Sequence, residues 1–441
     1  MVSAILVLVI FIVIAALMIT KKLPTMVALP ILAISIAFVC GVPWVQYVDG
    51  KDAGTGIMKG IIEAGAIKMA NSYAALMIGA WIGQYMNHVG ISKTIIKTAA
   101  ELGGDRPFLV TLFVCIAIAL LYTTVSGLGA VIMAATIALP ILISVGVPKV
   151  MAGCIFLFSY AIGLSVNLAN WTYFCSVTGI EFATVQTFSF ILMGLTACTA
   201  LAFIVIQFKK NGLKFAWAAP QDEKNTEGGE EFTKAPVLSL FTPIVPMILV
   251  VGFKWSVIAS FLAGLLYCFL TMLIFGKGHD IKKLIAMLSR SAIDGIADTA
   301  VATMIMIGIG MLASSLGNAI VTGKISGFVE LILPSQSWAF VLFFAILAPL
   351  ALYRGPLNIW GLGSGIAAIM VGLNILPPQA ITCAFVSCER VQVIGDPTNS
   401  HNVWISSYVG TDTNQILVKV FPYIWVLAAS GAVTTALLYL F

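Results

Sequence analysis

Four short polar segments interrupt the apolar stretches of this sequence and contain most of the polar residues found there. They are residues 123–129 (TTVSGLG), 165–170 (SVNLAN), 353–358 (YRGPLN) and 395–402 (GDPTNSHN). Gly and Pro in such segments free backbone carbonyls that can bind a cation, while the amide ends of half-helices offer partial positive charge to an anion. One pocket built from these segments could therefore hold both ions.

The last segment is the most informative for cation binding. Asp396, Thr398 and Asn399 place a carboxylate, a hydroxyl and an amide around a helix-stopping Pro, in a stretch otherwise made of Val, Ile and Phe. An oxygen cage for a small cation needs these groups. The alternative is that Asp396 only caps the half-helix that starts at Pro397.

Arg354 is a permanent charge within an apolar hairpin, where it costs at least a few kcal/mol unless it is paired. Its partner is either the carboxylate of a substrate, held by two parallel hydrogen bonds, or Glu389 on the adjoining apolar stretch. Glu389 and Arg390 are neighbours on a helix, so we expect them to face apart and to have separate partners. Glu389 is then either a proton carrier or one half of a static ion pair.

The remaining ionisable residues leave two interpretations open. Asp294 and Asp298 lie one helical turn apart beside Arg290, a spacing more typical of a solvated face than of a cation site. His401 could relay protons or could simply complete the polar break.

Motifs of other protein classes are missing from the sequence. It contains no H-E-x-x-H, no G-x-S-x-G and no Walker-type glycine loop, so neither an intramembrane protease nor an ATP-driven pump is supported. The net charge of +5 lies in short loops and forms no stripe with interleaved aromatics, which argues against nucleic acid as a partner. The 8 Cys are scattered without a C-x-x-C pair, so we expect neither disulfides nor a metal site. No cofactor is expected beyond a coupling Na+ or H+.

Composition assigns the chain to the membrane. Of the 441 residues 60% are hydrophobic and 9% charged, against about 25% charged in soluble domains. Runs of about 20 apolar residues, each long enough to cross the bilayer as a helix, recur along the chain. They are residues 3–20, 24–42, 71–90, 148–172, 183–207, 238–253, 257–275, 297–318, 378–404 and 418–440. The fold class expected is an all-α polytopic membrane protein.

Two further apolar stretches, residues 107–146 and 337–373, are predicted to be re-entrant hairpins, because each bends at Gly or Pro without a charged loop. The two halves also resemble each other. Residues 59–83 correspond to 286–310, and each half then continues with a hairpin, a Pro-started span and an Asn-x-x-Asn break. The predicted units are a first repeat (1–207), a cytoplasmic linker (208–236) and a second repeat (237–441).

Each repeat has five crossings and one hairpin, and an odd number inverts the second repeat relative to the first. Inverted repeats with broken helices place a solute site at their interface near the bilayer midplane. With the N-terminus outside, most of the 23 Lys and Arg residues fall in cytoplasmic loops, as the positive-inside rule requires. Both termini are therefore expected outside, in a multi-pass protein of a bacterial-type inner (plasma) membrane.

This order of elements resembles the ion transporter superfamily over nearly the whole chain. The segment Ser126-Gly127-Leu128-Gly129 and the breaks beginning at Asn167 and Asp396 are most similar to those of the citrate and gluconate permeases. The resemblance implies a homodimer whose scaffold (spans 1, 2, 6 and 7) holds an elevator-like domain of hairpins and broken helices. It implies uptake of a small carboxylate coupled to protons or sodium. The expected substrate-binding residues are Thr124, Ser126, Gly127, Asn167, Asn170, Arg354, Asn358, Thr398 and Asn399.

Asp396, Glu389 and His401 are expected to carry the coupling cation or proton. The rival interpretation within the same superfamily is a cation/proton antiporter without an organic substrate. In that case Asp396 and Glu389 exchange the ions and Arg354 is structural.

Overall fold

The computed structural model is almost entirely helical and describes residues 2–20, 22–49, 51–212, 234–276, 280–332, 336–373 and 376–441. The helices of the first half are α1 (Val2–Ile19), α2 (Thr25–Val39), the π-helix η1 (Ile57–Glu63), α3 (Ala64–Ile67), α4 (Ala70–His88), α5 (Ile91–Leu102), α6 (Pro107–Tyr122), α7 (Leu128–Ser144), α8 (Lys149–Ser165), α9 (Leu168–Thr178) and α10 (Phe182–Asn211). Those of the second half are η3 (Val237–Phe241), α11 (Val245–Phe253), α12 (Val257–Phe275), α13 (Ile281–Leu316), α14 (Ala319–Ile332), α15 (Ser337–Leu347), η4 (Ala348–Arg354), α16 (Gly363–Gly372), α17 (Pro378–Gly395), α18 (Ser400–Val409) and α19 (Thr413–Tyr439).

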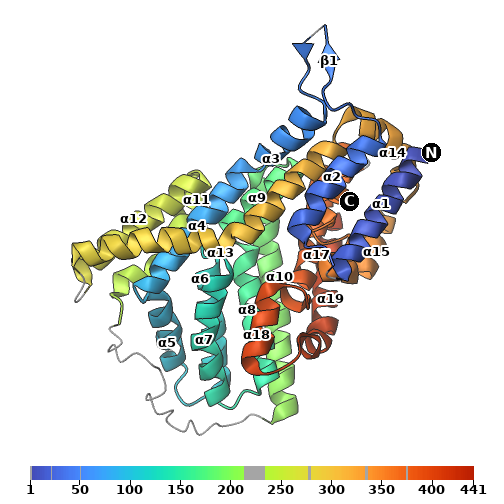
Figure 1. Cartoon of the computed structure of the whole chain (residues 1–441). Helices are drawn as coiled ribbons and strands as arrows, with labels where there is room; N and C mark the ends of the chain where they lie inside the picture. The colour runs from blue at the N-terminus through green and yellow to red at the C-terminus, as the bar shows by residue number, and fades with distance from the viewer. Residues whose placement is uncertain are drawn as a thin grey trace.

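Two short strands, β1 (Tyr47–Val48) and β2 (Lys51–Asp52), pair in an antiparallel hairpin that projects from the helices (Figure 1). Lys59 forms an ion pair of 2.9 Å with Asp52 at its base. This hairpin is the one departure from the predicted all-α fold in the ranges that the structure describes. The all-α prediction is otherwise confirmed.

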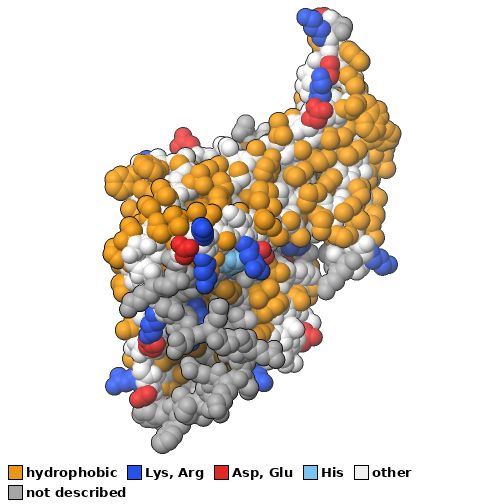
Figure 2. Space-filling model, turned by 60° about the vertical axis from the view of Figure 1, so that its left-hand side comes forward, with side chains coloured by type: hydrophobic (Ala, Val, Ile, Leu, Met, Phe, Trp, Pro, Cys, Tyr) orange, Lys and Arg blue, Asp and Glu red, His pale blue; other side chains and the backbone are white. Residues whose placement is uncertain are grey.

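Several helices are suited to cross a membrane. Among the described residues α10, α12, α13, α19 and the stretch Ser337–Arg354 are long and apolar enough to do so, and α8 and α9 qualify together with a 63° bend between them. Large side chains such as Phe275, Val418 and Leu437 are exposed. Figure 2 shows hydrophobic side chains over a broad area of one face, with charged side chains gathered at the projecting hairpin and below that area. Such a surface must face lipid, which confirms a multi-pass membrane protein.

The structure places a break at each of the four polar segments. Gly127 adopts a φ of +101° at the start of α7, a conformation that favours glycine. Asn167 lies at the N-cap of α9, where its side chain accepts two backbone N–H bonds. Tyr353 and Arg354 both have positive φ, 56° and 54°, and end η4. Pro397 follows the end of α17 and has no N–H to continue the helix.

The two halves repeat the same order of elements, and their packing is symmetric when the halves are exchanged. The long helices α4 and α13 pack on each other; α2 packs on α13 as α12 packs on α4. Likewise α9 packs on α16 as α18 packs on α7. The predicted duplication would produce this symmetry. The opposite orientation of the two repeats in the bilayer stays a prediction.

The expected element boundaries need three corrections. Residues 238–253 form a short 3-10 turn (η3) followed by α11 instead of one span, and residues 297–318 overlap the end of the 36-residue α13. The amphipathic helices α5 and α14, which precede the two hairpins, were not expected. Both precede a hairpin, so they strengthen the correspondence between the halves.

The chain ends lie in the same half of the molecule as the β-hairpin, whereas α10 runs to the opposite end (Figure 1). Of the predicted linker 208–236, residues 213–233 lie outside the described residues. On its far side Lys234 pairs with Glu101 of α5 at 2.9 Å, and the Ala235 amide donates to Thr94 Oγ1. The second half therefore begins against α5.

Candidate solute-binding site

A cavity of about 180 Å³ lies where the hairpin tips and the helix breaks of both halves meet. Seven of the predicted site residues line it: Ser126, Gly127, Asn170, Arg354, Glu389, Asn399 and His401. The cavity is smaller than the roughly 300–1,000 Å³ of sites for drug-sized ligands. It therefore suits a small solute.

The other five predicted residues support the breaks instead of lining the cavity. They are Thr124, Asn167, Asn358, Asp396 and Thr398. Thr124 donates to the carbonyl of Pro243 at 2.5 Å, which fixes the first hairpin to the η3–α11 turn. The Asn358 amide donates to the Ala351 carbonyl at 3.1 Å. These bonds are made within the protein and leave little capacity for a solute.

Asn167 joins the first hairpin to the break between α8 and α9. Its Nδ2 donates to the carbonyls of Tyr122 and Val125, at 2.9 and 3.2 Å, and its Oδ1 accepts the amides that cap α9. Both ends of the side chain are satisfied. Asn170 follows one turn later, lines the cavity and donates to the Leu164 carbonyl at 3.3 Å. Of the first Asn-x-x-Asn pair, Asn170 is therefore the residue placed to contact a solute.

Asp396 organises the break between α17 and α18. It is completely buried, and Oδ1 accepts from the amide and hydroxyl of Thr398 at 2.8 and 2.7 Å. Oδ2 accepts the backbone amide of Arg354 at 3.3 Å. These bonds close a turn over Pro397 and fix the second hairpin tip. They do not cap the next half-helix as the alternative had it, because α18 begins at Ser400 with Asn399 as its N-cap. Asn399, which donates to the Gln392 carbonyl, is the member of this segment that lines the cavity.

Arg354 supplies a cation to the cavity, and its guanidinium forms no direct ion pair within the described residues; the Asp396 carboxylate is close enough to attract it but bonds its backbone amide. Nη1 donates to the Trp360 carbonyl at 3.4 Å, and none of the ion pairs formed by the described residues includes Arg354. The expected alternative, an ion pair between Arg354 and Glu389, is absent from the described chain. A guanidinium in this position can bind a carboxylate through two parallel hydrogen bonds.

Glu389 and Arg390 were expected to have separate partners, and this expectation is wrong. Arg390 Nη2 donates to Glu389 Oε2 at 2.5 Å, and both side chains are buried. The pair forms because Arg390 extends to α8, where Nη1 donates to the Ala161 carbonyl and to Ser165 Oγ at 2.7 and 2.9 Å. The two long side chains bend toward each other, which a rule based on helix faces does not anticipate.

Aromatic side chains that were not predicted enclose the cavity. Trp360 Nε1 donates to Glu389 Oε1 at 2.9 Å, and the Trp360 ring stacks on Tyr173 with centroids 3.8 Å apart. Tyr173 donates its hydroxyl to the Ile359 carbonyl, so α9 of the first half holds the hairpin tip of the second. On another side the ring of Tyr160 packs against the ring of His401, with centroids 4.9 Å apart. The Trp360 and Tyr160 rings line the cavity.

His401 Nε2 lies 3.1 Å from the Val393 carbonyl. A carbonyl accepts only, so Nε2 carries the proton and Nδ1 is left as an acceptor. Gln392 also lines the cavity, and its Oε1 has no hydrogen-bond partner within the described residues. The cavity thus combines a cation with acceptors that could bind hydroxyl groups.

Asp298 of α13 is the main site residue that sequence reasoning missed. It lines the cavity and accepts a hydrogen bond from Gln84 of α4. Asp294, one turn earlier, pairs instead with His88 at 3.2 Å and Arg290 at 3.7 Å. The solvated-face interpretation therefore holds for Asp294 and is wrong for Asp298. The signal in the sequence was the pair of glycines at 127 and 129, where the absence of a Cβ leaves room for Asp298.

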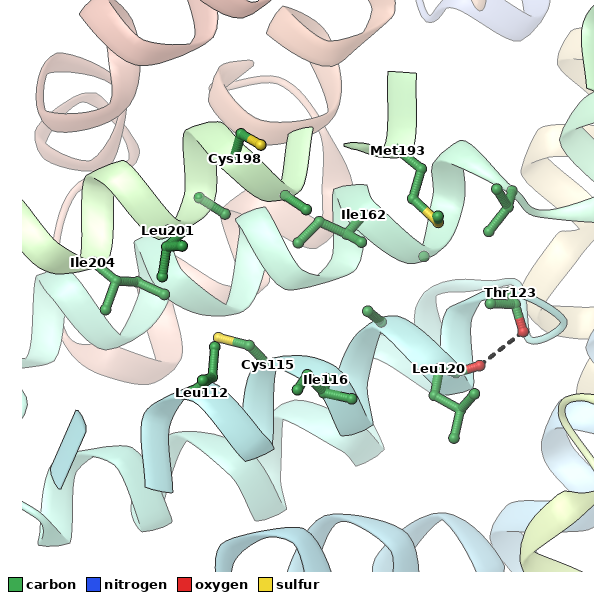
Figure 3. Close-up of a pocket in the computed structure, with 15 residues that line it drawn as sticks. Leu112, Cys115, Ile116, Leu120, Thr123, Ile162, Met193, Cys198, Leu201 and Ile204 are labelled. Carbon is green, nitrogen blue, oxygen red and sulfur yellow. Dashed lines mark hydrogen bonds between the residues drawn. The ribbon is translucent and has the colours of Figure 1, made fainter. Parts of the chain in front are cut away.

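A second cavity, of about 490 Å³, lies between α6, α8 and α10 (Figure 3). Its lining is aliphatic, as Leu112, Ile116 and Leu201 show, and no charged side chain of the described chain takes part. The hydroxyl of Thr123 is bonded to the Leu120 carbonyl at 2.8 Å. This cavity offers no group for a carboxylate, so the smaller one is the candidate site.

The fold of this chain is similar to that of a solved protein structure. No family model matches the sequence, and no curated protein matches it. A solved structure does match, that of the YdaH transporter of Alcanivorax borkumensis, reported to reveal an unusual topology. The match has a TM-score of 0.60 at 13% identity and covers 93% of this chain and 97% of YdaH. This is the fold of a membrane transporter. The finer resemblance to citrate and gluconate permeases stays a prediction.

Proposed function

We propose that the protein is a secondary active transporter that takes up a small organic anion coupled to protons or sodium. The observation that carries the proposal is the cation of Arg354, which faces a small cavity between hairpins and broken helices without a carboxylate partner in the described chain. Leaving such a charge uncompensated at membrane depth is costly. A bound carboxylate would compensate it.

The size and polarity of the cavity support the substrate class. Ser126, Asn170 and Asn399 line it beside Arg354, and Gln392 leaves an acceptor unpaired. These groups suit a carboxylate that carries hydroxyls or a second carboxylate, such as citrate, a dicarboxylate or a sugar acid. The antiporter alternative needs Arg354 to be structural. It has less support because the guanidinium makes only one bond in the described chain, of 3.4 Å to the Trp360 carbonyl, and no ion pair.

We further propose an elevator mechanism in a homodimer of a bacterial-type plasma membrane. The moving domain would comprise both hairpins and both broken helices, with α1, α2, α11 and α12 as the scaffold. Support comes from the packing, in which α9 contacts α16 and α18 contacts α7, so that the hairpins and breaks of the two halves form one body.

The test is ligand binding and flux with matched arginine variants. Citrate, succinate and gluconate are screened for a rise in the melting temperature of the purified protein. Labelled forms are then offered to proteoliposomes under a proton or a sodium gradient. Arg354→Ala should abolish the thermal shift and the uptake, whereas Arg290→Ala, on the exposed face of α13, should keep both. If no carboxylate enters under either gradient while sodium drives proton movement, the antiporter alternative is correct.

A further inference from the structure

Asp298 holds the tip of the first hairpin from outside that hairpin. Helix α7 begins at Leu128 without a side-chain N-cap of its own. The Asp298 carboxylate lies directly against the backbone of Gly129 in its first turn, near enough to interact with the Gly129 amide. A Cβ at Gly127 would lie 3.1 Å from the Asp298 Cβ, and one at Gly129 would overlap the carboxylate. The Asp298 side chain of α13 therefore lies at the amide end of α7, in the place that an N-cap side chain would take.

The surroundings of Asp298 contain no cation that neutralises it among the described residues. On its own helix Asp294 is a second acid, already paired with His88 of α4 and Arg290. From α4 the neutral Gln84 faces it, and from α7 the Gly129 amide. Across the cavity lie the ionisable groups of Arg354, Glu389, His401 and Tyr160, of which Glu389 is paired with Arg390. Of the charged residues that line the cavity, Arg354 and Asp298 thus lack an ion pair in the described chain; Asp396, which does not line it, attracts Arg354 from the helix break.

The groups that contact Asp298 are hydrogen-bond donors. The neighbours of its carboxylate are the Gln84 side-chain amide and the Gly129 backbone amide, whose N–H groups have no lone pair to offer a metal cation. A sodium ion requires a shell of oxygen ligands such as carboxylates, carbonyls and water. A proton requires only one free lone pair of the carboxylate. The donor set around Asp298 therefore fits protonation better than sodium binding.

We propose that the coupling ion is a proton and that Asp298 carries it. The inference rests on the proposed function, in which the hairpin moves with the solute. Ionised Asp298 ties the N-terminus of α7 to α13, through a charge-assisted bond and a favourable interaction with the helix dipole. A proton on one carboxylate oxygen removes the charge and turns that oxygen into a donor. Protonation therefore releases the hairpin from α13.

The contact between Asp298 and the start of α7 links proton binding to anion binding, although the two ions do not touch. Ser126 and Gly127, which line the cavity, directly precede the helix whose amide end Asp298 faces. Thr124 keeps its bond to Pro243 on the other side of the tip, so the α7 end is the part that protonation frees. An anion bound at Arg354 and a proton bound at Asp298 would together leave the cavity with no unpaired charge when the hairpin moves.

The first experiment requires no substrate. Hydrogen–deuterium exchange of the peptide spanning residues 123–131 is measured in wild type, Asp298→Asn and Asp294→Asn, all at one pH. Asp298→Asn loses the charge-assisted contact and should therefore exchange about fivefold faster. A change of about fivefold corresponds to a loss of roughly 1 kcal/mol, which is typical of one hydrogen bond. Asp294→Asn should match wild type. Equal exchange in all three proteins would overturn the inference.

The second experiment measures coupling in proteoliposomes with an internal pH dye. For the carboxylate that shifts the melting temperature of wild type, Asp298→Asn should lose proton-driven accumulation and the accompanying proton flux, and its exchange of labelled for unlabelled substrate should no longer depend on pH. Asp294→Asn should keep all three, and Asp298→Glu should keep proton coupling. Proton-driven accumulation by Asp298→Asn would refute Asp298 as the carrier.

Failure of the proposed function has a different signature. If no carboxylate binds to wild type, the uptake proposal falls, and proton movement driven by a sodium gradient then becomes the readout. Asp298→Asn should abolish that proton movement while Asp294→Asn keeps it. Undiminished proton movement through Asp298→Asn would overturn the proton assignment on its own.

Discussion

The buried pair of Glu389 and Arg390 joins the two broken helices of the molecule. Arg390 reaches from α17 to the carbonyl of Ala161 and the hydroxyl of Ser165 on α8, and Glu389 is held on its other side by Trp360. Neither side chain is more than 1% exposed. With so many protein partners, the pair has the geometry of a structural link between the halves.

Removing one partner of this pair should be far more damaging than replacing both. Arg390→Met leaves a buried carboxylate without its cation, a change that costs about 3–5 kcal/mol in buried pairs. The double variant Glu389→Gln/Arg390→Met leaves no buried charge and should recover most of that loss. The measurement is the loss of helical circular dichroism during titration with SDS.

Measuring transport by the double variant distinguishes this structural role from the coupling role that the sequence predicted for Glu389. The double variant should retain proton-coupled uptake, because the proposed carrier is Asp298. Loss of proton coupling in a stable double variant, with solute exchange intact, would return the coupling role to Glu389.

At the level of residues, sequence reasoning was most successful where a charge or break had no other explanation. Arg354, Asn170 and Asn399 could be predicted because polar groups in an apolar stretch need partners, and all three line the cavity. Asp298 could not, because its spacing from Asp294 is the same as on a solvated face. Trp360 could not either, since an aromatic ring in an apolar stretch looks like core until the Glu389 beside it is known.

Among the elements, the first hairpin depends on glycine at a position where a side chain has no space. A Cβ on Gly129 would overlap the Asp298 carboxylate, whereas a Cβ on Gly194 of α10 would meet nothing within 4 Å. Gly129→Ala should therefore displace Asp298 and speed hydrogen exchange across residues 123–131, as Asp298→Asn does. Gly194→Ala should leave that exchange unchanged.

The double variant Gly129→Ala/Asp298→Asn tests whether both changes act on one contact. Residues that act through a shared contact have non-additive effects. The exchange rate of the double variant should therefore equal that of the faster single variant. Rates that multiply would mean that Gly129 is required for another reason.

The breaks could be predicted at the level of elements, and the short helices between them could not. Gly127, Asn167 and Pro397 are residues that end or start helices, so their positions in apolar stretches were informative. Helix α5 has only 12 residues and contains two Lys and a Glu, which makes it look like a polar loop from the sequence. Its buried face includes Ile91, Ile95 and Ile96. The sequence does not show what that face packs against, because the hairpin of α6 and α7 covers it only in the folded protein.

At the scale of the whole molecule, the positions of the chain ends indicate on which side of the membrane each half begins and ends. The chain ends and the β-hairpin lie in one half of the molecule, and α10 ends in the other, at Lys209, Lys210 and Asn211 (Figure 1). A repeat that begins on one side and ends on the other crosses an odd number of times. We therefore expect two such repeats in series to have opposite orientations.

The positive-inside rule then assigns the sides. Lys209 and Lys210 in the last turn of α10 should be cytoplasmic, which puts both chain ends outside. Alkaline phosphatase, active only outside the cytoplasm, should be active when fused after Phe441 and inactive when fused after Asn211 to the truncated chain. Green fluorescent protein, which folds in the cytoplasm, should show the reverse at the same two positions. Active phosphatase at both positions, or at neither, would mean that the second half crosses an even number of times. That result would remove the inverted repeat on which the solute site between the halves depends.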